Sequence, residues 1–418
     1  MTPDDLHDLA ARHGVPGAQV GTLTPDGIRV LTTGVTSRAT AVPVDEDTLF
    51  QYGSISKVWT TALVLQLVDE GRLTLDTPVV DVLPSFRIAD PGHTAAITVR
   101  HLLTHTSGIG GDVFTDTGDN DDCLERYVDG LATVGSVTRP GGPLSYCNSG
   151  FVVAGRIVEV LRGGSWDDAL KDHLLDPLGL DHVITRVRDA PLFRTAVGHA
   201  DGEPVKRWML PRALGPAGLI TGTARDLLRF TAAHLGDGPA RRMREEQVSL
   251  REVSTVDTGW GLGWALADWA GVACVHHGGR TIGQAAKLWA FPERGLALCV
   301  LTNSPDGSGL AEDVAALFAA EHGLVPPQPR VDADADLTGL EGVYETLLTR
   351  LTLTRDEHGF HLEVAGEGVT EPRKPVQPTG RGRFVVDMNG ARREFAHLEH
   401  DGADFLYLNR LFRRVTTR

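Results

Sequence analysis

The segment from Ser54 to Val68 constrains the fold of this chain more than any other part of the sequence. Residues 58–68 (VWTTALVLQLV) are mostly apolar and stop just before Gly71, which predicts a buried helix. Ser54 and Lys57 stand three residues apart at its start and would share one helix face. A lysine shielded from water can accept the proton of a serine hydroxyl. The segment predicts a nucleophilic serine; the alternative is a helix-capping serine beside a surface lysine.

Two later motifs favour the nucleophile interpretation. Because the chain has only five lysines, a serine three residues before a lysine is expected by chance only about 0.2 times. A Y-x-N motif stands at 146–148, where the chance expectation is lower still, at about 0.06. An H-x-G motif at 277–279 is flanked by apolar segments of the kind that form strands. Each motif alone is a weak signal, but the three in this order are a specific combination.

Around these motifs the chain resembles the serine β-lactamase and penicillin-binding-protein superfamily, and within it the class C β-lactamase-like branch. Residues 49–84 are similar to the branch around its nucleophile, and 97–109 (ITVRHLLTHTSGI) to a non-catalytic signature. Residues 139–155 resemble its tyrosine motif, and the likeness extends over about 14–322. The resemblance implies an α+β fold, with an antiparallel sheet, helices on the sheet and an all-helical lobe.

The resemblance also implies roles for the motif residues. Ser54 would attack a carbonyl group and form an acyl-enzyme, with either Lys57 or Tyr146 as the general base. Tyr146 is expected to have a lowered pKa because cationic or donor groups stabilise a phenolate. The backbone N–H groups of Ser54 and Arg280 would form the oxyanion hole. Substrate positioning and close approach of the strand are assigned to Asn148, His277 and Gly279.

Residue patterns divide the chain into three predicted parts. A catalytic domain, 1–324, would contain strands at 18–23, 28–33, 261–266, 272–277, 285–291 and 296–302, and a helix at 309–321. Residues 325–336 are rich in proline and polar side chains, which indicates a linker. Short alternating runs in 337–418 predict a small antiparallel β-barrel. Some members of the branch carry such a lipocalin-like barrel, which would either border the active-site cleft or serve stability alone.

Composition argues against several classes of function. The net charge of −15, without a basic stripe, argues against a nucleic-acid partner. No apolar run is long enough to span a bilayer, and the acidic N-terminus lacks a signal-peptide pattern. We therefore expect a cytoplasmic protein with no membrane partner. The four cysteines form neither a C-x-x-C pair nor a zinc pattern, and we expect no metal and no cofactor.

The predicted barrel offers further candidate substrate-binding residues. Its last strand, predicted at 409–415, carries three arginines, and alternation places Arg410 and Arg414 on one face and Arg413 on the other. We expect Arg413 or Arg414 to face the cleft and to hold a substrate carboxylate or carbonyl, because a planar guanidinium suits both. Trp208 is expected to form an apolar wall. Solvated charge is the alternative for such a run.

Two features favour an intracellular esterase, D-amino-acid-specific peptidase or acyltransferase over a β-lactamase. They are the expected cytoplasmic location and the histidine in the third motif, where class C β-lactamases have lysine. The chain resembles penicillin-binding-protein-type thioesterases, which release and macrocyclise nonribosomal peptides. An intracellular D-stereospecific aminopeptidase or esterase is the alternative, followed by a β-lactamase and a non-enzymatic binding protein. The expected substrate is a peptidyl thioester, a peptide or an ester, and a carrier protein is left open as a partner.

Overall fold

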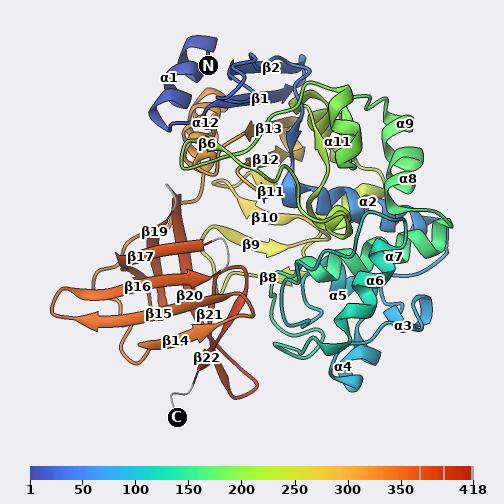
Figure 1. Ribbon diagram of the computed structural model, residues 1–418. Helices are drawn as coiled ribbons and strands as arrows, with labels where there is room; N and C mark the ends of the chain where they lie inside the picture. Colours follow the sequence, from blue (N-terminus) through green and yellow to red (C-terminus); the bar gives the residue numbers. More distant parts are fainter. Residues whose placement is uncertain (367–368, 389–390, 416–418) are drawn as a thin grey trace.

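The computed structural model describes residues 1–366, 369–388 and 391–415. The predicted barrel domain, 337–418, is therefore described except at 367–368, 389–390 and 416–418. Figure 1 shows an N-terminal domain that combines a sheet with a helical lobe, and a barrel drawn in orange and red that lies against it. The predicted α+β class is confirmed.

An antiparallel sheet of eight strands forms the centre of the N-terminal domain, in the order β2-β1-β13-β12-β11-β10-β9-β8. Strands predicted at 18–23, 28–33, 272–277, 285–291 and 296–302 are confirmed. The strand predicted at 261–266 is confirmed only at 265–266, because residues 261–264 form a turn in which Gly263 has a φ of +75°. The strands are β1 (Gly17–Thr24), β2 (Gly27–Gly34), β8 (Val248–Ser249), β9 (Asp257–Trp260), β10 (Ala265–Asp268), β11 (Ala273–Arg280), β12 (Ala285–Phe291) and β13 (Leu296–Thr302).

Helices cover both faces of this sheet. Because strand side chains alternate between faces, Leu298 and Val300 of β13 pack in one cluster with α1 (Pro3–Arg12) and α12 (Gly307–His322). Cys299 and Leu301 point the other way, into the main core beneath α11 (Ala224–Leu235). The predicted helix at 309–321 is confirmed within α12.

The buried helix predicted from the sequence is α2 (Ser56–Asp69), which stops before Gly71, where φ is +70°. Val58, Trp59 and Leu63 are fully buried, so α2 lies inside the main core. The lobe around α2 contains α3 (Val79–Val82), α4 (Pro91–Ala96), α5 (Val99–Leu103), α6 (Cys123–Gly130), α7 (Asn148–Arg162), α8 (Trp166–Leu170), α9 (Asp176–Leu178) and α10 (Gly215–Gly218).

Residues beyond the connection at 324–341, which contains no helix or strand, form a nearly closed antiparallel barrel of nine strands. Leu351, Phe384 and Phe395 belong to the apolar cluster that fills it. In hydrogen-bonded order the strands are β17 (Val369–Pro375), β16 (Gly359–Gly366), β15 (Thr349–Asp356), β14 (Gly342–Glu345), β22 (Leu411–Val415), β21 (Ala403–Tyr407), β20 (Ala391–His400), β19 (Arg383–Met388) and β18 (Gln377–Gly380).

The barrel contacts the N-terminal domain through the turn between β21 and β22. The Tyr146 N–H donates to the Asn409 carbonyl oxygen at 2.7 Å, and the Leu411 N–H donates to Ser145 Oγ at 3.2 Å. A shared apolar cluster surrounds these bonds and contains Leu144, Leu250, Trp260, Ala265, Ala396, Phe405, Tyr407 and Leu411. The barrel therefore contacts the Y-x-N motif directly.

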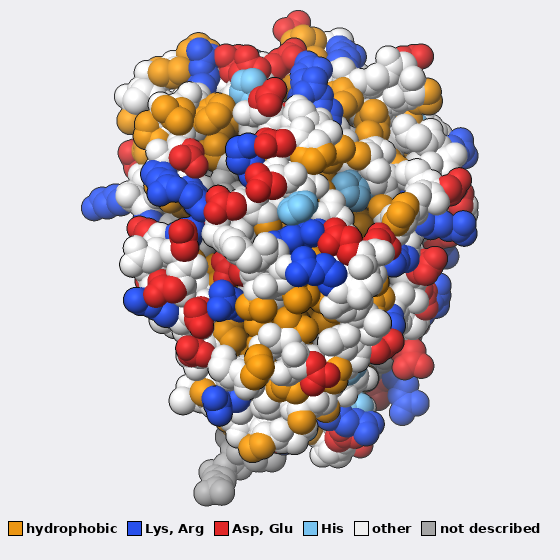
Figure 2. All heavy atoms as spheres, turned by 90° about the vertical axis from the view of Figure 1, so that its right-hand side faces the viewer, with side chains coloured by type: hydrophobic (Ala, Val, Ile, Leu, Met, Phe, Trp, Pro, Cys, Tyr) orange, Lys and Arg blue, Asp and Glu red, His pale blue; other side chains and the backbone are white. Residues whose placement is uncertain are grey.

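The surface carries charges of both signs. On the face shown in Figure 2, acidic and basic side chains are interspersed with apolar ones. Many are paired, as where both guanidinium ends of Arg162 donate to the Glu70 carboxylate at 2.8 Å. Within the part of the chain that the structure describes, no helix has both the length and the apolar character needed to cross a bilayer.

Candidate active site

Ser54 and Lys57 lie together at the point where a short turn enters the buried helix. Ser54 belongs to a 3-10 turn, η1 (Gly53–Ile55), and Lys57 to the first turn of α2. Lys57 Nζ lies 3.2 Å from Ser54 Oγ and donates a second hydrogen bond to the Ala217 carbonyl oxygen at 2.6 Å. Lys57 is fully buried and Ser54 half-buried. The alternative of a surface lysine is therefore wrong.

The surroundings of Lys57 disfavour its charged form. Burial lowers the pKa of its ammonium group to about 7, and Asp112 offsets only part of that change. Arg410 of the barrel acts in the same direction as burial. A substantial fraction of Lys57 is therefore an uncharged amine at neutral pH and can accept a proton from the adjacent hydroxyl.

Two glycines bring the nucleophile turn and strand β11 together, backbone against backbone. A Cβ on Gly279 would lie 1.9 Å from the Tyr52 carbonyl oxygen and 3.1 Å from the Ser54 nitrogen. A Cβ on Gly53, where φ is +55°, would lie 2.7 Å from the Arg280 nitrogen. Only glycine fits at these places. The Ser54 and Arg280 N–H groups predicted to bind an oxyanion therefore belong to two segments in direct contact.

Tyr146 lies beside Lys57, but its predicted pKa is wrong. The ring centre is 4.9 Å from Lys57 Nζ, and the His105 ring packs against it at an angle of 32°, with 4.1 Å between centres. Burial raises the pKa of the phenol above its ordinary value, and the neighbouring Ser54 and Arg410 lower it only in part. Tyr146 Oη lies close enough to Ser54 for this effect without a well-aligned hydrogen bond. Tyr146 is therefore a protonated donor in the resting structure.

His277 is a neutral side chain on β11. Burial, followed by the nearby Lys57, lowers its pKa to about 3. Its Nδ1 lies 2.6 Å from the Gly278 carbonyl oxygen, which can only accept, so Nδ1 carries the proton and Nε2 is an acceptor. Among the described residues, neither His277 Nε2 nor Tyr146 Oη has a hydrogen-bond partner, although both are buried. Buried polar atoms of this kind are expected to bond with a substrate or water.

Asp112 connects the Y-x-N motif to the barrel, a connection that sequence reasoning missed. Asn148 begins α7, and its N–H donates to Asp112 Oδ1 at 2.8 Å. The other carboxylate oxygen, Oδ2, pairs with Arg410, whose guanidinium lies 4.9 Å from the Tyr146 ring centre. Asp112 is only 8% exposed. Its place in an acid-rich loop gives no sign of burial, and residues 114–116 of the same loop are exposed.

The prediction for the barrel arginines needs correction, and that for Trp208 stays a prediction. Arg410, rather than Arg413 or Arg414, contacts Tyr146, because β22 begins only at Leu411 and the preceding turn reaches the site. Arg414 donates to Asp404 and to the Glu341 carbonyl within the barrel, and Arg413 is exposed. Trp208 is half-buried, and its Nε1 donates to the Ala196 carbonyl at 2.8 Å. Its own carbonyl accepts from the Gln51 side chain, so it packs behind the strand that leads to Ser54.

Comparison with known proteins decides the family. The beta-lactamase family profile matches residues 4–322. The chain belongs to the beta-lactamase family. It is similar to "Penicillin-binding protein 4" of Amycolatopsis lactamdurans, with 42% identity over 364 residues that cover 81% of this chain and 95% of that protein.

Two other similarities extend the comparison. "Esterase EstB" of Burkholderia gladioli is 30% identical over 319 residues, which cover 64% of this chain and 80% of that protein. A crystal structure of SurE with D-Leu superimposes with a TM-score of 0.75 and 27% identity, over 99% of this chain and 98% of that one. The family match ends before β14, whereas the likeness to SurE includes the barrel. The fold is that of the serine β-lactamase and penicillin-binding-protein superfamily of hydrolases and acyltransferases.

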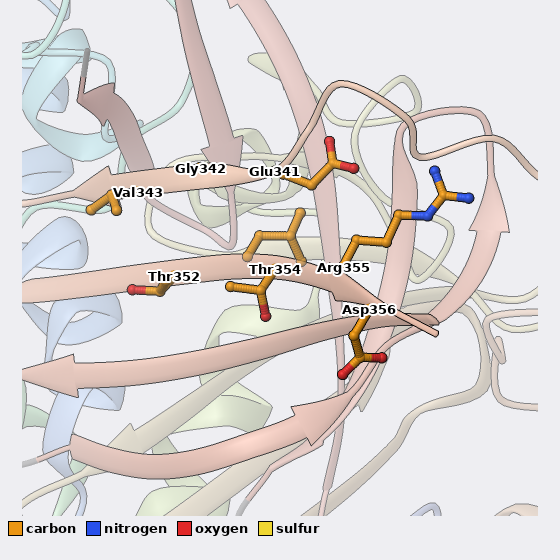
Figure 3. Close-up of a pocket in the computed structure, with 8 residues that line it drawn as sticks. Glu341, Gly342, Val343, Thr352, Thr354, Arg355 and Asp356 are labelled. Carbon is orange, nitrogen blue, oxygen red and sulfur yellow. The ribbon is translucent and has the colours of Figure 1, made fainter. Parts of the chain in front are cut away.

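A cavity of about 300 Å³ lies between the family domain and the barrel, beside Tyr146 and Arg410. Its lining from the barrel is mainly apolar and includes Leu347, Leu351 and Phe412. Figure 3 shows a different hollow, of about 730 Å³, that is lined only by 341–343 and 352–356 of the barrel. That hollow contains none of the candidate site residues, so the interdomain cavity is the one that adjoins the site.

Proposed function

We propose that this protein is a serine acyltransferase of the penicillin-binding-protein type, which takes a peptidyl group onto Ser54 and releases it as a macrocycle. The observation that carries the acyl-enzyme is the pair of Ser54 Oγ and Lys57 Nζ, 3.2 Å apart. With a pKa of about 7, the buried Lys57 amine can accept the hydroxyl proton as the oxygen attacks. Lys57 is a better general base than Tyr146, whose pKa is raised by burial.

The reaction would proceed in two transfers. In the first, the bond between Ser54 Oγ and the acyl carbon forms, and the bond from that carbon to a thiol sulfur breaks. The Ser54 proton passes to Lys57 and on to the leaving sulfur, and Tyr146 is placed to donate along this path. In the second, the amine at the other end of the peptide attacks the ester carbonyl, an amide forms, and Ser54 Oγ recovers a proton. The Ser54 and Arg280 N–H groups would stabilise the oxyanion of both steps.

One observation supports a D-configured residue in the acyl group, and a second supports an apolar side chain on it. The likeness to the SurE structure with D-Leu covers 99% of this chain, including the barrel. The cavity beside Tyr146 is lined by apolar side chains of both domains and is large enough for the side chain of one apolar residue. We infer that this residue is the one whose carbonyl is attacked, because Tyr146 contributes to both the cavity and the candidate site.

Hydrolysis of an ester is a second candidate function, favoured by the 30% identity to Esterase EstB. The same serine, lysine and tyrosine would serve it, with water in place of the amine. The two functions therefore differ only in what resolves the acyl-enzyme, and product analysis distinguishes them.

The test uses peptidyl thioesters that end in either a D- or an L-residue. Intact-mass spectrometry is expected to show the wild-type protein gaining the mass of the acyl group from the D-substrate and little from the L-substrate. Product analysis is expected to show the cyclic peptide. Release of only the linear acid would favour the esterase or D-aminopeptidase function. Efficient turnover of nitrocefin would favour a β-lactamase, and a covalent adduct on Ser54→Ala would overturn the nucleophile.

A further inference from the structure

One ion pair between the two domains, Asp112–Arg410, lies beside Tyr146 of the candidate active site. The carboxylate of Asp112 accepts the N–H of Asn148 on one oxygen and pairs with the Arg410 guanidinium on the other. Asp112 is buried, whereas the side chain of Arg410 is 34% exposed. The pair thus joins a loop of the helical lobe, the first residue of α7 and the β21–β22 turn of the barrel.

Both charges of this pair face the Tyr146–Lys57 end of the site. Arg410 and Lys57 each lie 4.9 Å from the centre of the Tyr146 ring. The turn that carries Arg410 is held there by the bond from the Tyr146 N–H to Asn409, whose φ is +55°. A left-handed residue other than glycine is uncommon, and here it aims the turn at the motif. The contact therefore has fixed geometry on both sides.

We propose that the Asp112–Arg410 ion pair is a positioning device, through which the barrel holds the Y-x-N segment and balances the charge around Lys57. The inference rests on the proposed function, because it gives Lys57 the role of the base. Asp112 favours the ammonium form of Lys57, and Arg410 opposes it. Because the two charges act on Lys57 in opposite directions, each offsets part of the effect of the other. The ionisable groups around Lys57 are Asp112, Arg410, Cys147, His105, Tyr146 and His277.

Loss of Arg410 and loss of Asp112 should therefore move the pH dependence of the acylation rate in opposite directions. Without Arg410, Asp112 acts on Lys57 unopposed, the amine holds its proton more tightly and the acidic limb of the rate profile moves to higher pH. Without Asp112, the limb moves to lower pH. Each displacement is expected to be about one pH unit, as for the loss of one charge near a buried ionisable group. The double variant should return toward the wild-type midpoint.

The experiment measures the pre-steady-state acylation rate with p-nitrophenyl acetate from pH 5 to 10. This ester has no carboxylate or peptide for Arg410 to bind, so a change cannot come from lost substrate contacts. The variants are Arg410→Met, Asp112→Asn, their combination and Arg410→Lys, which keeps the charge and should keep the limb near its wild-type position. Arg392→Met is the control, because Arg392 forms an exposed barrel pair with Asp387 at 3.5 Å.

Opposite displacements in the two single variants, with recovery in the double variant, would establish the proposal. Unchanged midpoints in both, or displacements that Arg392→Met reproduces, would overturn it. If Arg410→Met does not fold, as judged by circular dichroism, the near-isosteric Asp112→Asn and the charge-preserving Arg410→Lys carry the test. A Ser54→Ala variant that still acylates would instead overturn the proposed function, so the two failures are distinguishable.

Discussion

The two sides of the candidate active site are built in different ways. On one side, the nucleophile turn and β11 meet through backbone contacts at Gly53 and Gly279, with no room for a methyl group. On the other, the Tyr146 segment is held by a buried carboxylate, an arginine and a turn of the barrel. The first side is fixed by steric exclusion and the second by charge and apolar packing. Substitutions on the first side should therefore abolish or strongly reduce the rate, and substitutions on the second should change it moderately.

Because the barrel contacts the second side directly, its removal cannot show whether the barrel is only a lid over the cleft. Deleting 331–418 has a simple outcome only if the barrel is a separate lid over the cleft. In this structure the deletion would expose Leu144, Leu250 and Trp260 to water and would leave Asp112 without Arg410. Peptide and small-ester activities would then fall together for structural reasons. Point substitutions at the contact are therefore the sharper test.

The largest expected effect is that of Ser54→Ala, on the side where backbone segments meet (the backbone-built side). The variant should lose acyl-enzyme formation, with a rate at least about 10⁵-fold below wild type, because no other group replaces the attacking oxygen. Its melting temperature should be nearly unchanged, since Ser54 is half-buried and Lys57 keeps its bond to Ala217. Intact-mass spectrometry with an activated ester checks the first point and calorimetry the second. A persistent adduct would move the nucleophile elsewhere.

Lys57→Met should lower the acylation rate by about 10³-fold and abolish the acidic limb near pH 7, because the variant has no amine to deprotonate. A second consequence concerns stability. The pKa of Lys57 falls from 10.5 in a solvent-exposed state to about 7 when folded. Between these values the unfolded chain binds more protons, so stability rises with pH. Lys57→Met should remove that rise, as urea unfolding at pH 7 and pH 10 would show; an unchanged rate profile would make Tyr146 the base.

Gly279→Ala tests the steric half of the comparison. Its Cβ would collide with the Tyr52 carbonyl and push β11 away from Ser54, so kcat should fall by about 10²–10³-fold through loss of oxyanion stabilisation. Gly278→Ala is the matched control, because the three atoms nearest to its Cβ would all belong to the flexible Lys287 side chain, at 3.4 Å or more. Steady-state kinetics with a small ester compare the two. Equal losses would mean that general damage to β11, rather than contact with the nucleophile turn, is responsible.

The backbone-built side could be predicted from the sequence because its parts lie in short motifs. Ser54 and Lys57 are one helical turn apart, and the apolar run after them identified the buried helix. The strands of the main sheet were predictable from alternating or continuous apolar runs, and most of them are confirmed. The error at 261–266 arose because Gly261 and Gly263 interrupt an apolar run, and the turn follows the glycines rather than the hydrophobic pattern.

The side that holds Tyr146 through charge and apolar packing (the charge-built side) could not be predicted in the same way, because its residues are far apart in sequence. Asp112 and Arg410 are 298 residues apart, and neither belongs to a motif. Strand alternation assigned the wrong arginine because Arg410 lies in a turn, outside the strand that the pattern assumed. The predicted direction of the Tyr146 pKa shift was wrong. The motifs make the nearby cations evident, but the burial that outweighs them depends on the docked barrel.

The smallest expected effect belongs to the adjustable side and concerns Leu347 at the rim of the interdomain cavity. Its side chain is 62% exposed, although it is large and apolar, and it approaches Gly111 of the opposite domain, with 3.1 Å between Leu347 Cβ and an added Cβ. Leu347→Ser should lower kcat/KM about tenfold for acyl groups that end in a bulky apolar residue, because one apolar contact is lost. Activity on p-nitrophenyl acetate should not change, and stability should change by less than about 0.5 kcal/mol.

Leu192→Ser, at a position that is 79% exposed, is the control. Equal changes with both substrates, or none with either, would mean that the cavity does not hold the acyl group and that the barrel acts on the site only through Arg410 and the Asn409 turn.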